Sequence, residues 1–265
     1  MDDDQTAGHT EGLDIRYDDG VLRITMDRPA RLNAMTPDMS DRIAAELEGA
    51  AARDDVRVVV LAGSGGAFSS GADLSGADAH ECFDDTSLDR ANRVVRAVVA
   101  LDKPCVAAVG GIAAGVGCSL ALACDLVVAS ESSSFLLAFA RIGLMPDGGA
   151  TATVAASVGR ARAMRMALLG EALPAREAYD AGLVSHLTSE GAFDETVAQV
   201  VARLAEGPPL SYAATKKAVN AATLGHLHDA LERERTGQSV LLRTADVAEG
   251  MRAFVEKRRP VFRGE

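Results

Sequence analysis

Two glycine-rich stretches constrain the fold and chemistry of this chain more than any other feature. Residues 68–74 (FSSGADL) and 110–118 (GGIAAGVGC) each follow an apolar run, residues 56–62 and 105–109, that is typical of a buried strand. Glycine permits turns that leave backbone N–H groups bare. Two such groups aimed at one point form an oxyanion hole, which stabilises negative charge on a carbonyl oxygen. Either stretch alone is compatible with an ordinary strand-to-helix turn, but the two together indicate an anion-stabilising site.

The composition is that of a soluble globular protein. The chain has 265 residues, of which 48% are hydrophobic and 25% charged, enough for one large core. A net charge of −11 and the absence of Trp argue against a nucleic-acid partner, which needs a broad basic face. The acidic N-terminus is unlike a signal peptide, and no apolar run reaches membrane-spanning length. We therefore expect a cytoplasmic protein with no membrane partner.

Other chemistries leave no trace in the sequence. The cysteines show neither a C-x-x-C pair nor zinc spacing, and the histidines show no metal spacing with carboxylates, so we expect no metal site. The Gly115-x-Gly117 pair lacks the third glycine of a dinucleotide fingerprint, and there is no phosphate-binding P-loop. Cys118 lies beside a glycine loop, but no neighbouring histidine would activate it, which favours a packed small side chain over a nucleophile.

The first half of the chain alternates strand and helix patterns. Residues 1–11 form a polar, acidic segment that predicts a disordered tail. An Asp-Asp-Gly turn at residues 18–20 predicts a hairpin, and Thr36-Pro37 predicts the start of a helix that runs to about Arg53. Strands are then expected at residues 56–62, 105–109 and 125–129, separated by helices at 88–101 and 117–123. This alternation implies β-α-β crossovers and a largely parallel sheet.

Helical patterns dominate after Gly148-Gly149. Helices are expected at residues 150–157, 160–169, 174–181, 193–205 and 210–222, and over a long stretch, 227–255, that is broken near Gly237. The region from about residue 200 onward is therefore predicted to be a helical appendage.

Four motifs, in unbroken order over residues 13–263, resemble the crotonase, or enoyl-CoA hydratase/isomerase, superfamily. Residues 28–35 (RPARLNAM) resemble its RP-x-x-x-NA loop, and residues 68–74 resemble its F-C-x-G-A-D loop. Lys103-Pro104 with residues 111–125 resembles its KP…G-x-A-x-G-x-G segment, and residues 253–258 (AFVEKR) resemble its AF-x-EKR signature.

The resemblance implies an α/β fold in which β-β-α units form a spiral. Residues 12–199 would form this spiral core with the acyl-CoA site, and residues 200–265 a helical C-terminal trimerisation region. The implied ligand is an acyl-CoA thioester, with coenzyme A as part of the substrate and no separate cofactor. The implied assembly is a homotrimer or a dimer of trimers.

The resemblance also assigns roles to residues of the glycine loops. It places the two oxyanion N–H groups on Ala72 and Val116, the second helped by the N-terminus of the helix that follows. Substrate and coenzyme A contacts are assigned to Arg28, Arg31, Ser70, Gly71, Asp73, Leu74, Gly115, Phe139, Phe254 and Lys257. For the basic residues the alternative is solvated surface charge, and for Asp73 it is an anchor for its own loop.

The catalytic acids of the family's hydratases are missing. Those hydratases use two glutamates, and the corresponding positions hold Ser119 and Phe139. Serine is not a general base at neutral pH without help, and phenylalanine cannot transfer a proton. Hydration by the two-glutamate route is therefore disfavoured.

One carboxylate, Asp147, is well placed to move a proton. The alternative role for Asp147 is to cap the following helix. Residues 139–149 and 158–164 resemble the branch that contains 1,2-epoxyphenylacetyl-CoA isomerase, in which an Asp at this position transfers the proton. Apolar neighbours would raise the Asp147 pKa and a helix N-terminus would lower it, and the sequence leaves that balance open.

We interpret the chain as an acyl-CoA isomerase that shifts a double bond or rearranges a ring. The intermediate would be a thioester enolate held by the Ala72 and Val116 amides, with Asp147 as the proton carrier. Two alternatives stay open: an enoyl-CoA hydratase with a non-standard base, and a catalytically silent acyl-CoA binder.

Overall fold

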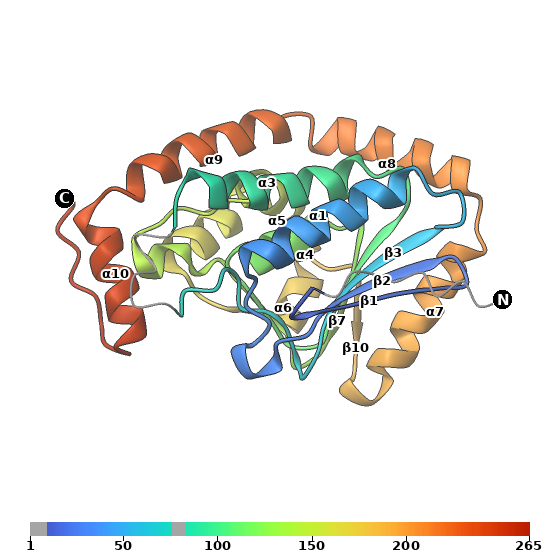
Figure 1. Cartoon of the computed structure of the whole chain (residues 1–265), viewed down its shortest axis with the longest axis horizontal. Helices are drawn as coiled ribbons and strands as arrows, with labels where there is room; N and C mark the ends of the chain where they lie inside the picture. The colour runs from blue at the N-terminus through green and yellow to red at the C-terminus, as the bar shows by residue number, and fades with distance from the viewer. Residues whose placement is uncertain (1–9, 76–82) are drawn as a thin grey trace.

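A six-stranded sheet forms the frame of the molecule. The computed structural model describes residues 10–75 and 83–265, so the acidic segment predicted at residues 1–11 lies almost entirely outside the described part. The strand order is β1-β2-β3-β5-β7-β10. The strands are β1 (Leu13–Asp18), β2 (Val21–Met26), β3 (Val58–Gly63), β5 (Cys105–Val109), β7 (Leu126–Ser130) and β10 (His186–Thr188). All neighbours are parallel except the β1–β2 hairpin, as the alternating sequence pattern predicts (Figure 1).

A second sheet of short strands gives the molecule its spiral. Its order is β4-β6-β8-β9, with strands β4 (Ala67–Ser69), β6 (Ile112–Ala114), β8 (Ser134–Leu136) and β9 (Leu173–Pro174). Each of the long strands β3, β5 and β7 is followed by one of these short strands and then by a helix. The chain therefore repeats a β-β-α unit. The sequence patterns did not predict the short strands or β10, because two or three residues are too few to show a period.

The apolar strands serve two cores because their side chains alternate between the faces of the sheet. On β3, Val59 and Leu61 join the main core, whereas Val58 and Val60 point to the opposite face. Helix α7 (Phe193–Ala205) covers that opposite face. The expected boundary between residues 199 and 200 falls inside α7.

The helices of the main core begin and end close to where the sequence predicts. They are α1 (Pro37–Ala51), α3 (Asp85–Ala100), α4 (Val116–Ala123), α5 (Ala150–Leu169) and α6 (Ala175–Asp180). The Thr36 hydroxyl accepts a hydrogen bond from the Met39 N–H (3.2 Å) and caps α1 as predicted. Gly159, at a φ of 75°, interrupts α5, so the two helices predicted at residues 150–157 and 160–169 are two segments joined at a kink.

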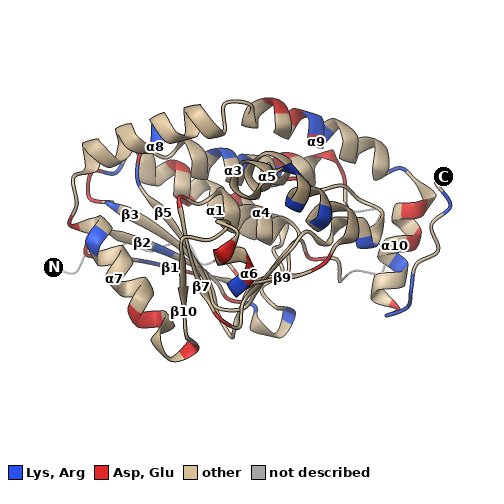
Figure 2. Cartoon of the chain, turned by 180° about the vertical axis from the view of Figure 1, so that it is seen from behind, with Lys and Arg blue, Asp and Glu red and all other residues tan. Residues whose placement is uncertain are grey.

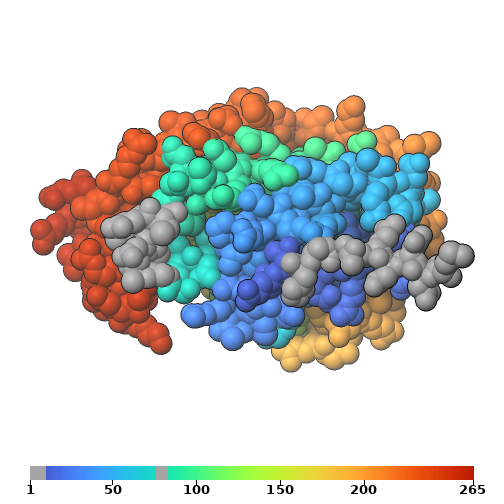
Figure 3. All heavy atoms as spheres, in the orientation of Figure 1, coloured from blue at the N-terminus to red at the C-terminus, as the bar shows by residue number. Residues whose placement is uncertain are grey.

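Three C-terminal helices arch over the edge of the molecule. They are α8 (Pro209–Thr223), α9 (Leu227–Leu241) and α10 (Ala245–Val255), and they form the orange-to-red surface along the top and one end (Figures 1 and 3). Arg235 on α9 and Asp89 on α3 form an ion pair at 2.6 Å. Within the described ranges, none of the helices combines the length and apolar character that crossing a membrane requires.

The predicted helix break near Gly237 is wrong. Helix α9 continues through Gly237, and the chain turns at residues 242–244, where Thr244 caps α10. A Cβ atom at position 237 would lie 2.5 Å from the Met145 Sδ. Gly237 therefore lets the helix approach a neighbouring loop closely, and its role is not to end the helix.

Candidate active site

The two glycine-rich stretches lie against each other at the start of α4. Gly71 has a φ of 99°, and a Cβ on it would lie 2.9 Å from the Ala114 carbonyl oxygen and 3.4 Å from the Val116 nitrogen. Gly115, at a φ of 53°, precedes the first residue of α4. Both positions have a positive φ, which glycine adopts without strain, and Gly71 is also in close contact with the other loop.

The backbone N–H groups of Ala72 and Val116 are left free by the local geometry. Around Ala72, Met35 donates its N–H to the Gly71 carbonyl (2.8 Å) and accepts from the Asp73 N–H (3.0 Å). Val116 opens α4, so its N–H has no acceptor inside the helix. Neither N–H donates to a backbone acceptor in the part of the chain that the structure describes. The geometry is compatible with an oxyanion hole, which stays a prediction.

Buried polar residues of the same motifs hold these loops in place. The Asn33 side chain accepts from the Arg28 N–H (2.9 Å) and donates to the Ser64 and Ala67 carbonyls (both 2.8 Å). The Ser69 hydroxyl donates to the Asn33 carbonyl (2.8 Å) and accepts from the Gly71 N–H (3.1 Å). These bonds fix the turn that precedes Ala72.

Some side chains predicted to contact coenzyme A are bonded to other protein groups, and others are exposed. Arg28 donates to Asp73 (2.7 Å) and to the Ala34 carbonyl (2.7 Å), so the two charges anchor the loop, as the alternative for Asp73 proposed. Arg31 is exposed. Ser70 and Leu74, in the first glycine-rich stretch, are half-buried. Their contacts with a ligand stay predictions.

The C-terminal pair of predicted contacts lies at the end of α10. Phe254 is 62% exposed, and Lys257 follows the helix. Helix α10 packs on residues 138–142 (η2, Ala138–Ile142), where a Cβ on Gly250 would lie 2.6 Å from Ile142. The neighbouring Arg258 pairs with Glu249 at 2.5 Å, and Figure 2 shows both charge signs on α10. The positive charge of Arg258, next to the predicted contact Lys257, is therefore neutralised by a carboxylate of α10.

Asp147 lies next to the start of α4. The Ser119 hydroxyl on α4 donates to the Asp147 carbonyl (2.7 Å). A Cβ on the next residue, Gly148, would lie 3.0 Å from the Ser119 Cβ and 3.6 Å from the Val116 Cγ2. The fold thus brings the proposed proton carrier and one proposed oxyanion donor to the same place.

The Asp147 carboxyl is buried and only half satisfied. The residue is 6% exposed, and its Oδ2 accepts a hydrogen bond from the Gln238 Nε2 (2.9 Å). Its Oδ1 has no hydrogen-bond partner among the described residues. Buried polar atoms are normally paired, so an unpaired carboxylate oxygen calls for a functional explanation.

Burial raises the pKa of Asp147 to about 7, while the Gln238 hydrogen bond lowers it and the Glu234 charge raises it further. The sequence left this direction open. A carboxyl with a pKa close to neutrality can both take up and release a proton at physiological pH.

The alternative role of Asp147 was to cap α5, but its side chain makes no capping hydrogen bond. Gly149 occupies the N-cap position. Glu234 on α9 accepts instead from the Gly149 N–H (2.7 Å), the Thr151 N–H (2.9 Å) and the Thr151 hydroxyl.

The two positions that hold glutamates in the family's hydratases contain no acid. Ser119 is fully buried and bonded to the backbone, and Phe139 is a buried part of η2. The nearby Cys118 is also fully buried, and desolvation raises its pKa to about 12. This favours the packed small side chain over a nucleophile.

Two residues next to Asp147, Glu234 and Gln238, are not among those that the sequence predicts for the site. On α9 they continue the buried face formed by Leu227, Ala230 and Leu231. A Glu and a Gln at positions four residues apart on an otherwise apolar face were the available signal, because buried polar residues need partners.

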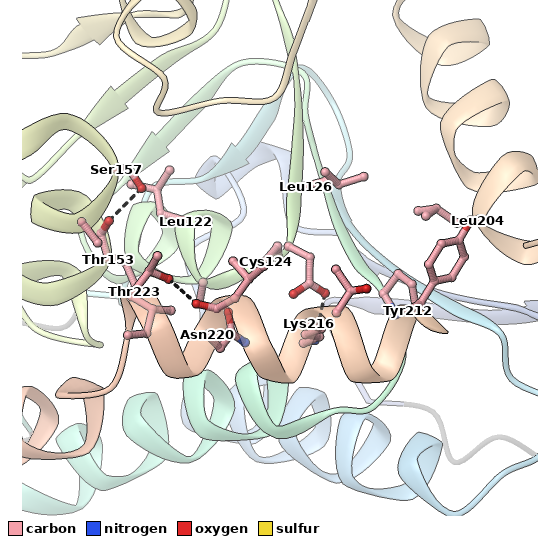
Figure 4. A pocket seen from close by; sticks show the side chains of 17 residues that line it. Leu122, Cys124, Leu126, Thr153, Ser157, Leu204, Tyr212, Lys216, Asn220 and Thr223 are labelled. Atoms are coloured by element: carbon pink, nitrogen blue, oxygen red, sulfur yellow. Dashed lines mark hydrogen bonds and ion pairs between the residues drawn. The ribbon is translucent and has the colours of Figure 1, made fainter. Parts of the chain in front are cut away.

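A cavity of about 520 Å³ lies beneath α8, at the amino ends of the strands and away from the glycine loops (Figure 4). Its lining includes Asp125 and Lys216, which form an ion pair at 2.8 Å. Lys216 also donates to the Val98 (2.9 Å) and Lys103 (3.2 Å) carbonyls. In parallel sheets ligands bind at the carboxyl ends of the strands, where the glycine loops lie, and this cavity is at the other end.

Comparisons with known proteins agree with the motifs. A family model described as Enoyl-CoA hydratase/isomerase matches residues 16–265. A probable enoyl-CoA hydratase of Rhodobacter capsulatus is 42% identical over 94% of this chain and 98% of that protein. The 1,2-epoxyphenylacetyl-CoA isomerase of Escherichia coli is 36% identical over 93% of this chain and 96% of that protein.

A solved structure has the same fold. The crystal structure of an enoyl-CoA hydratase from Mycobacterium avium subsp. paratuberculosis superimposes with a TM-score of 0.90 at 50% identity. The match covers 95% of this chain and 98% of that one. The α/β spiral of β-β-α units with C-terminal helices is thereby confirmed.

Proposed function

The chain belongs to the enoyl-CoA hydratase/isomerase family of the crotonase superfamily, and on that premise we propose that it is an acyl-CoA isomerase. It shifts a double bond or rearranges a ring next to the thioester carbonyl. Relatives named as hydratases and as isomerases are both similar to it, so its own residues must distinguish the two activities.

The single observation that carries the proposal is the half-satisfied carboxyl of Asp147. It is buried, has one oxygen without a partner in the described ranges, and lies beside the first turn of α4. Its pKa of about 7, raised chiefly by burial, suits a group that takes a proton from one carbon and returns it to another.

The proposed reaction needs one carboxylate and two amide donors. With a 3-enoyl thioester, Asp147 removes a proton from C2, and the electron pair moves onto the carbonyl oxygen to give a dienolate. The Ala72 and Val116 N–H groups stabilise that oxyanion, and each such donor is worth on the order of 3 kcal/mol of barrier. Protonated Asp147 then delivers the proton to C4, so no atom is gained or lost.

Hydration is the competing activity within the same family. It requires one group to activate water and another to deliver a proton, and the positions that hold these acids in hydratases contain Ser119 and Phe139. A single carboxylate suits the return of its own proton better than the addition of water.

We also propose the remaining properties that the resemblance implies. Coenzyme A enters as part of the substrate, with Arg31 and Lys257 as candidate phosphate contacts and no separate cofactor. The protein works in the cytoplasm. It assembles as a homotrimer or a dimer of trimers, and sedimentation would measure the mass of this assembly directly.

The test is to incubate the protein separately with a 3-enoyl-CoA and a 2-enoyl-CoA and to identify the products. We expect double-bond migration without hydration. Asp147→Asn lowers kcat by roughly 10²- to 10⁴-fold, the usual contribution of a general acid–base, while acyl-CoA binding is retained. Asp229→Asn, an exposed change on α9, is the matched control and leaves kcat unchanged.

Other outcomes contradict the proposal in distinct ways. A 3-hydroxyacyl product would identify a hydratase with a non-standard base. Acyl-CoA binding without any product would identify a silent binder. An Asp147→Asn variant that isomerises at the wild-type rate would remove Asp147 from the mechanism.

A further inference from the structure

Helix α9 meets the segment around Asp147 through two buried polar side chains. Gln238 is fully buried and Glu234 is 1% exposed. They lie one helical turn apart on α9. Gln238 bonds to residues 145 and 147, and Glu234 bonds to residues 149 and 151, which follow Asp147 in the chain. Neither belongs to the four motifs or to the predicted site.

The carboxamide of Gln238 bridges the backbone and the carboxyl. Its Oε1 accepts from the Met145 N–H (3.1 Å), and its Nε2 donates to the Asp147 Oδ2 (2.9 Å). The first bond fixes the orientation of the amide, so the nitrogen has to face Asp147. One carboxyl oxygen is thereby held, and the other stays available for the substrate.

Glu234 fills the place that Asp147 would otherwise take. It accepts from the Gly149 and Thr151 N–H groups at the start of α5, where the helix dipole favours a negative charge. Asp in this position of a sequence usually caps the helix itself. With the cap supplied from α9, the Asp147 carboxyl keeps a free oxygen.

Helix α4 brings two uncharged side chains, Val116 and Ser119, to the segment that contains Asp147. Glu234 and Gln238 are the groups whose charge and hydrogen bond act on the pKa of Asp147 after burial, the first raising it and the second lowering it.

We propose that α9 controls the proton carrier through two positioning residues with separate tasks. Gln238 orients the Asp147 carboxyl, and Glu234 caps α5 so that this carboxyl stays free and faces a nearby negative charge. The inference rests on the proposed function of Asp147. It predicts that changes at the two positions act in opposite directions on the same titration.

The experiment compares Gln238→Met and Glu234→Gln in the full-length protein, with Glu232→Gln on the exposed side of α9 as the control. The readout is the pH dependence of kcat/KM for isomerisation, whose rising limb reports deprotonation of Asp147. Gln238→Met removes a donor to the carboxylate and moves the limb to higher pH. Glu234→Gln removes a negative charge and moves it to lower pH.

The kinetic constants separate positioning from binding. Gln238→Met lowers kcat roughly tenfold to a hundredfold, as expected for a misplaced catalytic group, and leaves KM within about threefold. Glu232→Gln moves neither the limb nor kcat. A merely structural role would lower thermal stability without shifting the two limbs in opposite directions.

Asp147→Asn, measured in parallel, distinguishes the two proposals. If it retains activity, the proposed function fails. If it is inactive while Gln238→Met and Glu234→Gln keep the wild-type limb and kcat, the positioning role of α9 is overturned. Should Gln238→Met fail to fold, Glu234→Gln alone decides, because an unshifted limb in that nearly isosteric variant contradicts the proposal.

Discussion

Two carboxylates at opposite ends of the strands, the partly exposed Asp125 and the buried Asp147, have very different partners. Asp125, at the start of β7, accepts from the Cys105 N–H (2.7 Å) and pairs with Lys216 of α8 (2.8 Å). Beyond the carboxyl ends of the strands, the Asp147 carboxyl has one partner among the described residues, the neutral Gln238 of α9 (2.9 Å). Burial raises the pKa of both groups, but at Asp125 the Lys216 charge and the Cys105 N–H oppose it.

The comparison separates a structural carboxylate from the proposed proton carrier. The Lys216 cation favours the ionised form of Asp125, so this carboxylate has a structural role. An amide orients Asp147 without supplying a charge, so its proton stays exchangeable near neutrality. Both partners come from the C-terminal helices (Figure 1), which therefore contribute to the two ends of the core in opposite ways.

Removing the cation should have the largest effect on stability. Lys216→Met leaves the partly exposed Asp125 carboxylate without its counter-charge. We expect a loss of about 3 kcal/mol of unfolding free energy, the lower end of the range for buried pairs. Chemical denaturation measures the loss. The double variant Lys216→Met/Asp125→Asn should recover a large part of it, and equal losses in the single and double variants would show that the pair is not the cause. Below the unfolding transition, isomerisation should continue at the wild-type rate.

Replacing Asp147 by asparagine should, in contrast, stabilise the protein relative to wild type as the pH rises. Between pH 4 and pH 7 the folded protein holds a proton that the unfolded chain has released, so wild-type stability falls across that window. Asp147→Asn cannot titrate. Its stability relative to wild type should therefore improve by roughly 3 kcal/mol between pH 5 and pH 8, at about 1.4 kcal/mol per pH unit up to pH 7. A difference that stays constant with pH would place the Asp147 pKa near its ordinary value.

A third variant tests the catalytic end alone. Val116→Pro removes the proposed oxyanion N–H, and proline is tolerated at the first position of a helix. The expected result is a fall in kcat/KM that corresponds to about 3 kcal/mol of barrier, with little change in melting temperature. Val116→Ala keeps the N–H and is the matched control. Equal rates in the two variants would exclude this amide from the mechanism.

Local signals were sufficient to predict most of the long strands and helices, whereas the spiral of β-β-α units was implied by the family resemblance. The Thr36 cap, the turn at residues 18–20 and the apolar run at 105–109 depend only on neighbouring residues, and the structure has each of them. The short strands β4, β6, β8 and β9 depend on pairing between distant segments. Nothing in two or three residues announces such a pairing.

The candidate site shows the same division. The glycine loops could be singled out because glycine carries its conformational freedom in its own residue type, and Asp147 because its segment resembles a branch of the family. The direction of the Asp147 pKa could not, because it is set chiefly by burial under segments distant in the sequence, and then by Gln238 and Glu234, about ninety residues away along the chain. Gly237 was misinterpreted for the same reason: its neighbour Met145 is distant in sequence.

The contact between Gly237 and Met145 offers the smallest and most local test of how α9 approaches the segment that contains Asp147. Replacing a helical glycine by alanine normally stabilises a protein by about 1 kcal/mol. Here the new Cβ would lie 2.5 Å from the Met145 Sδ, and displacing that side chain costs a similar amount. Gly237→Ala should therefore be neutral, or destabilising by up to about 1 kcal/mol. In a Met145→Ala background the same change should stabilise by about 1 kcal/mol, because the obstacle is gone. Equal effects in the two backgrounds, measured by denaturant unfolding, would mean that α9 does not approach residue 145 as closely as Gln238 requires.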